Sequence, residues 1–81
     1  MSSETTRQGH DKPAFARNLT AAIAATGETP EAFARRVDLT LRMVQRYRSG
    51  ESEPSGQNAV RIAQALGLSV EELFTPLEEA A

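Results

Sequence analysis

The 81-residue sequence has no cysteine or tryptophan, and it has a single tyrosine and a single histidine. Without cysteine, neither disulfide bonds nor thiolate metal sites can form, and His10 has no second histidine with which to share a metal. No run approaches the roughly 18 apolar residues of a membrane helix, and the N-terminus lacks an apolar signal region. We therefore expect a cytoplasmic chain that has no metal or cofactor and does not enter a membrane.

Catalytic signatures are also missing from the sequence. There is no recognisable nucleophile–base pair, metal-ligand set or phosphate-binding glycine loop. We therefore do not expect an enzyme.

The length and composition favour one small, all-α domain. A chain of this size buries only about 60–65% of its unfolded surface, so the core has to come from helix packing, which agrees with the many alanines. Residues 1–12 are small and polar without periodicity and are expected to form a flexible tail. The predicted domain covers residues 13–75, and residues 76–81 form an acidic tail.

The charges are unevenly distributed along the chain. The net charge of −2 argues at first against a nucleic-acid partner, but residues 14–50 hold six arginines against three acidic residues. Residues 51–81 hold one arginine against six glutamates. The positive part therefore coincides with the central stretch described next, and the acidic remainder limits non-specific binding to a polyanion or simply aids solubility.

Residues 29–50 predict two short helices joined by a tight turn. Thr29 and Pro30 are typical of a helix start, the pattern breaks at Asp38-Leu39, and Thr40 is a second candidate N-cap. The first helix is expected over residues 30–37 and the second over residues 41–48. In the second helix Val44 and Tyr47 lie on one side, and the polar side chains of Arg42, Gln45 and Arg46 lie on another. An apolar back and an Arg/Gln/Arg front suit insertion into a major groove.

Three further helices are expected around this pair. The first starts near Pro13 and stops before Gly27, with Arg17 and Asn18 outside an inward stripe that comprises Phe15, Leu19, Ala22 and Ile23. The fourth spans residues 56–66 after the cap Ser55, and its expected core residues are Val60, Ala63 and Leu66, with Ile62 partly inward. The fifth follows the capping box of Ser69 and Glu72, and it ends at Thr75-Pro76.

Three segments, FARRVDLT, RYRSGESEP and RIAQALGLSVEELF, occur in an order and spacing that resemble a known family. Residues 15–74 are similar to the Cro/repressor-type helix-turn-helix family, also called XRE-like or lambda-repressor-like. The resemblance implies a compact five-helix DNA-binding domain with the helix-turn-helix at its second and third helices. A single module of this kind buries only roughly 600–1,000 Å² on DNA, so we expect a homodimer on a near-palindromic DNA operator.

The resemblance further assigns roles to individual residues. The residues expected to contact base edges are Leu41, Arg42, Gln45 and Arg46. The expected phosphate contacts are Thr29, Thr40, Arg48, Ser49, Ser52, Ser55, Gln57 and Asn58. Leu68, Leu73, Phe74 and Leu77 could supply a dimer surface, although the first three could equally belong to the core.

The sequence departs from the family pattern at several positions. Pro30 removes an N–H near the expected phosphate, and Asp38 stands where relatives usually have a left-handed glycine. Two glutamates occupy the loop beside the DNA backbone. Relatives often pair an arginine late in helix 1 with a glutamate late in helix 3, whereas this chain has Ile23 and Arg48 there. We therefore expect Arg48 to reach a phosphate.

Two functions remain open at this stage. The first is a sequence-specific, double-stranded DNA-binding transcriptional regulator that acts as a repressor or dual regulator. The alternative is a protein-interaction module of the same fold, such as an antitoxin or phage regulator whose main partner is another protein. The acidic loop, Pro30 and the acidic C-terminal third favour the alternative, and the Arg42/Gln45/Arg46 face opposes it.

Overall fold

The computed structural model describes residues 12–76 and has five helices in this range. They are α2 (Ala14–Thr26), α3 (Pro30–Arg36), α4 (Leu41–Ser49), α5 (Gly56–Ala65) and α6 (Val70–Phe74), and no strand occurs within the described range. The predicted all-α class and the five-helix arrangement are therefore confirmed. None of the described helices has the length and apolar character needed to cross a membrane.

The helix ends follow from local hydrogen bonding. Thr29 and Thr40 accept hydrogen bonds from the backbone N–H groups three residues later, as expected for N-caps. Ser69 and Glu72 form the reciprocal capping box at the start of α6. Ser55 occupies the N-cap position of α5, but its side chain makes no capping hydrogen bond, which differs from the prediction.

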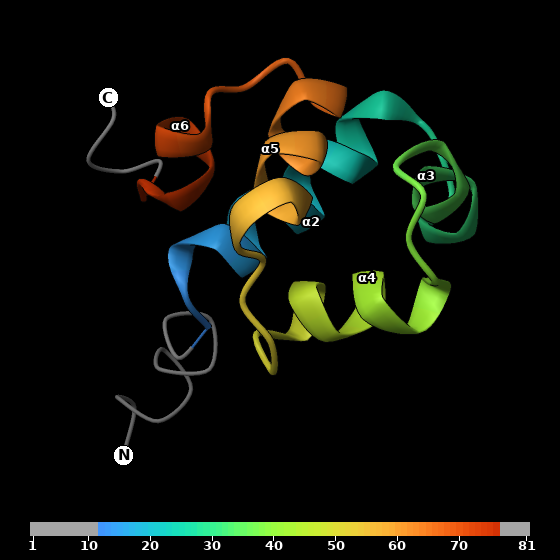
Figure 1. The fold of residues 1–81 in the computed structure, drawn as a ribbon, viewed down its shortest axis with the longest axis horizontal. Coiled ribbons are helices and arrows are strands. Elements are labelled where there is room, and N and C mark those ends of the chain that lie inside the picture. Colours follow the sequence, from blue (N-terminus) through green and yellow to red (C-terminus); the bar gives the residue numbers. More distant parts are fainter. Residues whose placement is uncertain (1–11, 77–81) are drawn as a thin grey trace, which may run out of the picture.

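The core joins all five helices. Its largest fully buried side chains include Leu19, Phe33, Val44, Ile62 and Leu73, which come from α2, α3, α4, α5 and α6 in turn. In Figure 1, α4 runs along one edge of the molecule and α6 lies away from it, beyond α2 and α5. The helix α2 packs against both α4 and α6, so it connects the helix-turn-helix to the C-terminal helix.

Two predictions of burial were wrong. Asn18, expected outside, is only 5% exposed, and its amide donates hydrogen bonds to the backbone of α6. Val60, expected in the core, is exposed, because α5 turns Ala59, Ile62 and Ala63 inward instead. These three residues follow the i, i+3, i+4 spacing of one helix face.

Other burial predictions were only partly right. Ile62, expected to be partly inward, is completely buried, and Leu66 is half-buried against the core. In α2, Ala22 is half-buried and Arg17 is also half-buried rather than outside. Ala16 is fully buried although it was absent from the predicted stripe. The proposed tails, residues 1–12 and 76–81, lie outside the described residues except for Lys12 and Pro76.

Candidate nucleic-acid interface

The turn between α3 and α4 is held by a left-handed residue. Asp38 has φ of 63°, the conformation expected where relatives have glycine. The N–H of Leu39 then reaches back to the carbonyl of Ala34 at 2.8 Å, which satisfies the end of α3. Leu39 is half-buried and packs against the core. The orientation of α4 relative to α3 is therefore fixed by backbone hydrogen bonds and packing.

The helix α4 turns its apolar side inward. Val44 is fully buried and Tyr47 is 3% exposed, so both anchor α4 on the core as predicted. The amide of Asn58 donates to the hydroxyl of Tyr47 at 3.2 Å, which links α5 to α4. Asn58, predicted to assist at a phosphate, is thus already engaged within the fold.

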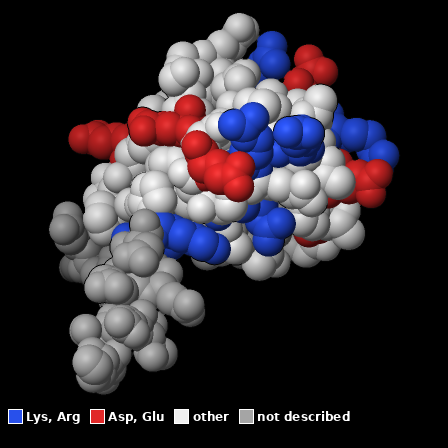
Figure 2. Space-filling model, turned by 90° about the horizontal axis from the view of Figure 1, so that it is seen from below, with Lys and Arg blue, Asp and Glu red and all other residues white. Residues whose placement is uncertain are grey.

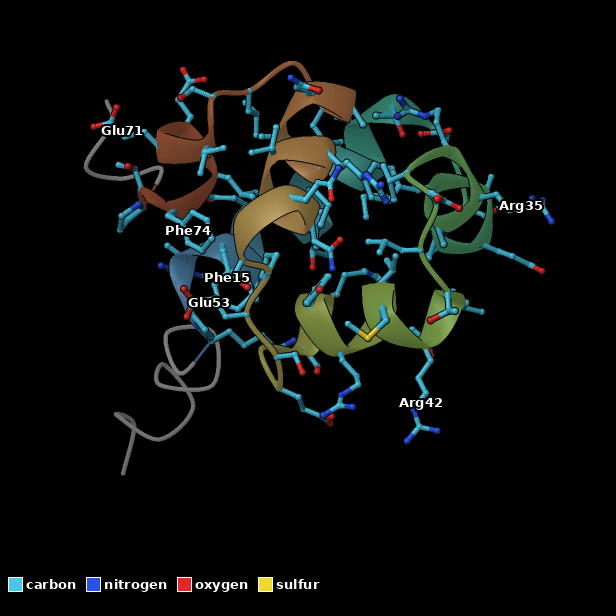
Figure 3. The ribbon with its side chains drawn as sticks, in the orientation of Figure 1. Phe15, Arg35, Arg42, Glu53, Glu71 and Phe74 are labelled. Carbon is cyan, nitrogen blue, oxygen red and sulfur yellow. The ribbon has the colours of Figure 1, made fainter. Side chains whose placement is uncertain are left out.

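The opposite side of α4 carries the residues predicted to contact bases. We call Leu41, Arg42, Gln45 and Arg46 the reading face. Arg42, Gln45 and Arg46 are exposed, and together with Ser49 and Glu51 they line one shallow hollow of about 550 Å³. Leu41 is half-buried at the start of α4. Figure 3 shows Arg42 extending from α4 away from the body of the domain.

The residues predicted to contact phosphates have different local settings, and Ser49 is the one that lines the hollow of the reading face. The side-chain oxygens of Thr29 and Thr40 accept from backbone N–H groups at 3.1 Å, which leaves each hydroxyl hydrogen free to donate. The hydroxyl of Ser49 donates to the carbonyl of Arg46 at 3.0 Å. Ser55 and Gln57 are exposed at the start of α5, and Ser52 is half-buried in the loop.

Arg48 is half-buried beside the reading face. Its Nε is buried and has no hydrogen-bond partner among the described residues. This position, late in α4, gives Arg48 a stem held by the fold. Contact of Arg48 with a phosphate stays a prediction.

A second arginine, Arg36, is held on the surface by contacts with two other segments. Arg36 donates two hydrogen bonds to the carboxylate of Glu28, at 2.7 and 2.9 Å, and a third to the carbonyl of Ala65 at 3.1 Å. The hydrogen bonds from Arg36 lower the pKa of Glu28 below its ordinary value of 4.5, and the same contact raises the pKa of Arg36. Arg36 therefore joins α3 to the end of α5, although both Arg36 and Arg35 are exposed.

Acidic residues interrupt the positive surface. Figure 2 looks at the molecule from the side on which α4 lies, and acidic side chains lie between the basic ones on this face. One of the pairs was missed by sequence reasoning: Glu51 Oε1 lies 3.7 Å from Arg46 Nε. Spacing within the loop could not reveal it, because the pair depends on how the chain turns after α4.

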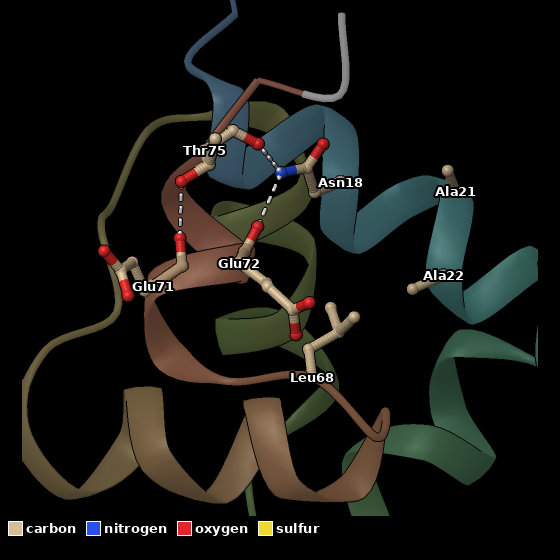
Figure 4. Close-up of a pocket in the computed structure, with 7 residues that line it drawn as sticks. All are labelled: Asn18, Ala21, Ala22, Leu68, Glu71, Glu72 and Thr75. Atoms are coloured by element: carbon tan, nitrogen blue, oxygen red, sulfur yellow. Dashed lines mark hydrogen bonds between the residues drawn. The ribbon is translucent and has the colours of Figure 1, made fainter. Parts of the chain in front are cut away.

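The expected dimer residues divide into three groups. Leu73 is fully buried and belongs to the core, whereas Leu68 and Phe74 are half-buried and packed against it. Leu77 lies outside the described residues. A second hollow of about 440 Å³ lies between α2 and α6, where Leu68 and the alanines of α2 form its apolar side and Glu71 lies at its rim (Figure 4).

Comparison with known proteins connects this geometry to a family. A family model described as helix-turn-helix matches residues 27–73. An uncharacterised HTH-type transcriptional regulator from Haemophilus influenzae is 46% identical over 46 residues, which is 57% of this chain but only 19% of the relative. The crystal structure of the hypothetical transcription factor NHTF from Neisseria aligns with a TM-score of 0.77. The alignment covers 83% of this chain and 77% of the Neisseria chain at 24% identity, so it supports the fold alone.

Proposed function

The chain belongs to the helix-turn-helix family of transcription regulators, and we propose that it binds double-stranded DNA with α4 in the major groove. The observation that carries this proposal is the reading face, where three long polar side chains lie exposed on a helix whose opposite side is fixed in the core. The alignment with the relative from Haemophilus influenzae spans 19% of that protein, so the proposal concerns this domain only.

Sequence recognition is assigned to the four residues of the reading face. Arg42 and Arg46 have the fork geometry that matches the O6 and N7 atoms of guanine, and Gln45 matches adenine. Leu41 offers an apolar contact to a thymine methyl group. Thr29, Thr40, Arg48 and the polar residues of the loop and α5 start contact phosphates, which orients the domain without reading sequence.

The domain acts as a homodimer on a near-palindromic operator. A single module buries roughly 600–1,000 Å² on DNA, which is too little for tight binding, so two copies on half-sites about one helical turn apart are required. Leu68 and Phe74 remain the described candidates for the dimer surface. The protein would then repress transcription, or act as a dual regulator, in the cytoplasm.

Selection of bound duplexes from a random pool tests the proposal. We expect one enriched sequence with two related half-sites, and an affinity whose log–log salt slope is about −0.9 per phosphate neutralised. Arg42→Ala should then relax preference at one base pair by roughly 1–3 kcal/mol, whereas Arg35→Ala, on the exposed side of α3, should leave base preference unchanged. Absence of an enriched sequence at low salt would refute specific DNA binding.

The protein-interaction module remains the second candidate function. The hollow between α2 and α6 favours it, because Ala21, Ala22 and Leu68 present an apolar surface away from the reading face. Under this alternative, substitution of Leu68 would abolish partner binding, and salt would affect the interaction only weakly.

A further inference from the structure

Glu51 lies on the surface that carries the reading face. It lines the same hollow as Arg42, Gln45 and Arg46, and its side chain is 68% exposed. Its Oε1 approaches Arg46 through Nε, at 3.7 Å. The contact is longer than a hydrogen bond, so it is an electrostatic pairing that leaves both groups accessible.

The backbone fixes where the Glu51 side chain begins. The N–H of Glu51 donates to the carbonyl of Arg46 at 2.9 Å and also approaches the hydroxyl oxygen of Ser49 at 3.3 Å. Gly50 makes this turn possible with φ of 87°, and a Cβ at Gly50 would lie 2.8 Å from a side-chain carbon of Pro13. The carboxylate therefore stands beside Arg46 because of the way α4 ends.

The position of Glu51 at Nε of Arg46 determines which N–H groups of the guanidinium can bind DNA. An arginine has five N–H donors in a planar fork, and Glu51 approaches Arg46 at Nε, so the two terminal amino groups stay available to another acceptor. Those two groups can bind O6 and N7 of a guanine end-on while Nε keeps its carboxylate. A phosphate could accept from the same two groups, but its negative charge would then lie close to Glu51.

We infer that Glu51 is a positioning residue that sets sequence specificity through Arg46. It holds the guanidinium in the orientation that fits guanine, and its charge makes exchange of guanine for a phosphate unfavourable. This inference rests on the proposed function, since it concerns how the same face discriminates between DNA sequences. It assigns to Glu51 a selective role rather than a contribution to affinity.

Glu53 provides a matched control in the same loop. It is exposed and carries the same charge, but Figure 3 places it on the side of Phe15, away from Arg42. Removal of either charge should strengthen binding to every duplex to a similar extent, because one negative group near a polyanion disappears. A change in sequence preference that appears in Glu51→Gln but not in Glu53→Gln must therefore come from the position of Glu51 beside Arg46.

The experiment measures the affinity of wild-type protein, Glu51→Gln and Glu53→Gln for the selected operator and for a scrambled duplex of the same composition. We expect the ratio of the two affinities to fall about two- to fivefold in Glu51→Gln, as befits loss of an exposed ion pair, and to change little in Glu53→Gln. A set of operators with single base-pair replacements should show the lost preference at the pair that Arg46→Ala also affects. In the Arg46→Ala background, Glu51→Gln should change no preference.

Several results would overturn the inference. If the ratio of operator affinity to scrambled-duplex affinity were the same in Glu51→Gln and Glu53→Gln, Glu51 would act only as a negative charge and not through Arg46. A changed preference that persists without Arg46 would mean that Glu51 contacts a base itself, for example by accepting from cytosine N4. If the wild-type protein bound no duplex selectively, the proposed function would fail together with the inference. If the wild-type protein bound selectively but the affinity ratio were unchanged in Glu51→Gln, the inference alone would be rejected. Thermal melting of each variant verifies folding.

Discussion

Replacement of Asn18 by alanine removes the amide that holds the C-terminal end of α6 against α2. The Nδ2 atom of Asn18 lies 2.9 Å from the carbonyl oxygen of Leu73, 2.8 Å from that of Thr75 and 3.3 Å from that of Glu72. These carbonyls lie at the end of a five-residue helix, and that of Glu72 also accepts from the N–H of Thr75 at 3.3 Å. The variant should therefore lose stability although no apolar core residue is changed.

The loss of stability in Asn18→Ala can be estimated from the carbonyl groups that lose their donor. The two N–H groups of the amide contribute about 1 kcal/mol each, and the buried carbonyl of Leu73 costs about 1–3 kcal/mol more if left without a donor. Partial exposure of the other two carbonyls allows water to replace some of the loss. We expect a decrease in the free energy of unfolding of roughly 2–3 kcal/mol, or on the order of 10–20 °C in Tm for a domain of this size.

Urea unfolding followed by circular dichroism, together with thermal melting, measures this change. Asn58→Ala is the matched control, since it also truncates an asparagine but removes a single hydrogen bond, the 3.2 Å contact with Tyr47. It should cost about 1 kcal/mol or less. A loss below about 0.5 kcal/mol in Asn18→Ala would refute the reasoning, because water would then replace the amide without penalty.

A second substitution at the same position tests the direction of the hydrogen bonds. Asn18→Asp places carboxylate oxygens against the three carbonyl oxygens and should be more destabilising than alanine at neutral pH. Burial and repulsion should raise the pKa of the introduced carboxyl in the folded state, so the penalty should be smallest in acid, where its O–H can donate. A penalty independent of pH would contradict the orientation of the Asn18 amide in the structure.

Three other predictions concern single side chains and a turn. Gly50→Ala should destabilise the domain by roughly 1–3 kcal/mol and more than Gly27→Ala, because both positions have positive φ but a Cβ meets nothing within 4 Å at Gly27. Since the folded pKa of Glu28 lies below 4.5, the stability that the ion pair contributes is complete at neutral pH and is lost as the pH falls through that lowered pKa. The difference in Tm between wild type and Glu28→Gln should accordingly shrink as the pH is lowered from about 7 to about 3. Arg48→Ala should weaken binding equally on all duplexes and reduce the salt slope by about 0.9, and it should also lower Tm because the stem of Arg48 is half-buried. An unchanged salt slope, measured at a temperature at which the variant is folded, would show that Arg48 contacts no phosphate.

The predicted helix ends were close to those observed because their causes are local. Thr29, Thr40 and the Ser69–Glu72 box each satisfy N–H groups within three residues of the cap. Asp38 adopts the left-handed conformation that the turn demands. The spacing of Arg42, Gln45 and Arg46 likewise predicted that they would share a surface, and in the structure they line one hollow. Their contact with bases remains a prediction.

Burial was less predictable where the sequence pattern was weak. Alanines form much of the inward side of α5, so the larger Val60 was expected inside although Ala59 is the buried residue. Asn18 borders the apolar stripe of α2, and periodicity alone places a polar side chain there in solvent. Its burial makes sense once α6, more than 50 residues further along the chain, offers three carbonyls.

The sequence by itself determined the helices, the caps at Thr29, Thr40 and Ser69, the left-handed turn and the polar front of α4, because these depend on residues three to five positions apart. The tertiary structure decided which polar groups are available on the surface. It buried Asn18 against α6, tied Arg36 to Glu28 and Ala65, and placed Glu51 beside Arg46. The physical reason is that a hydrogen bond or ion pair between separate elements exists only after packing has brought its two groups together.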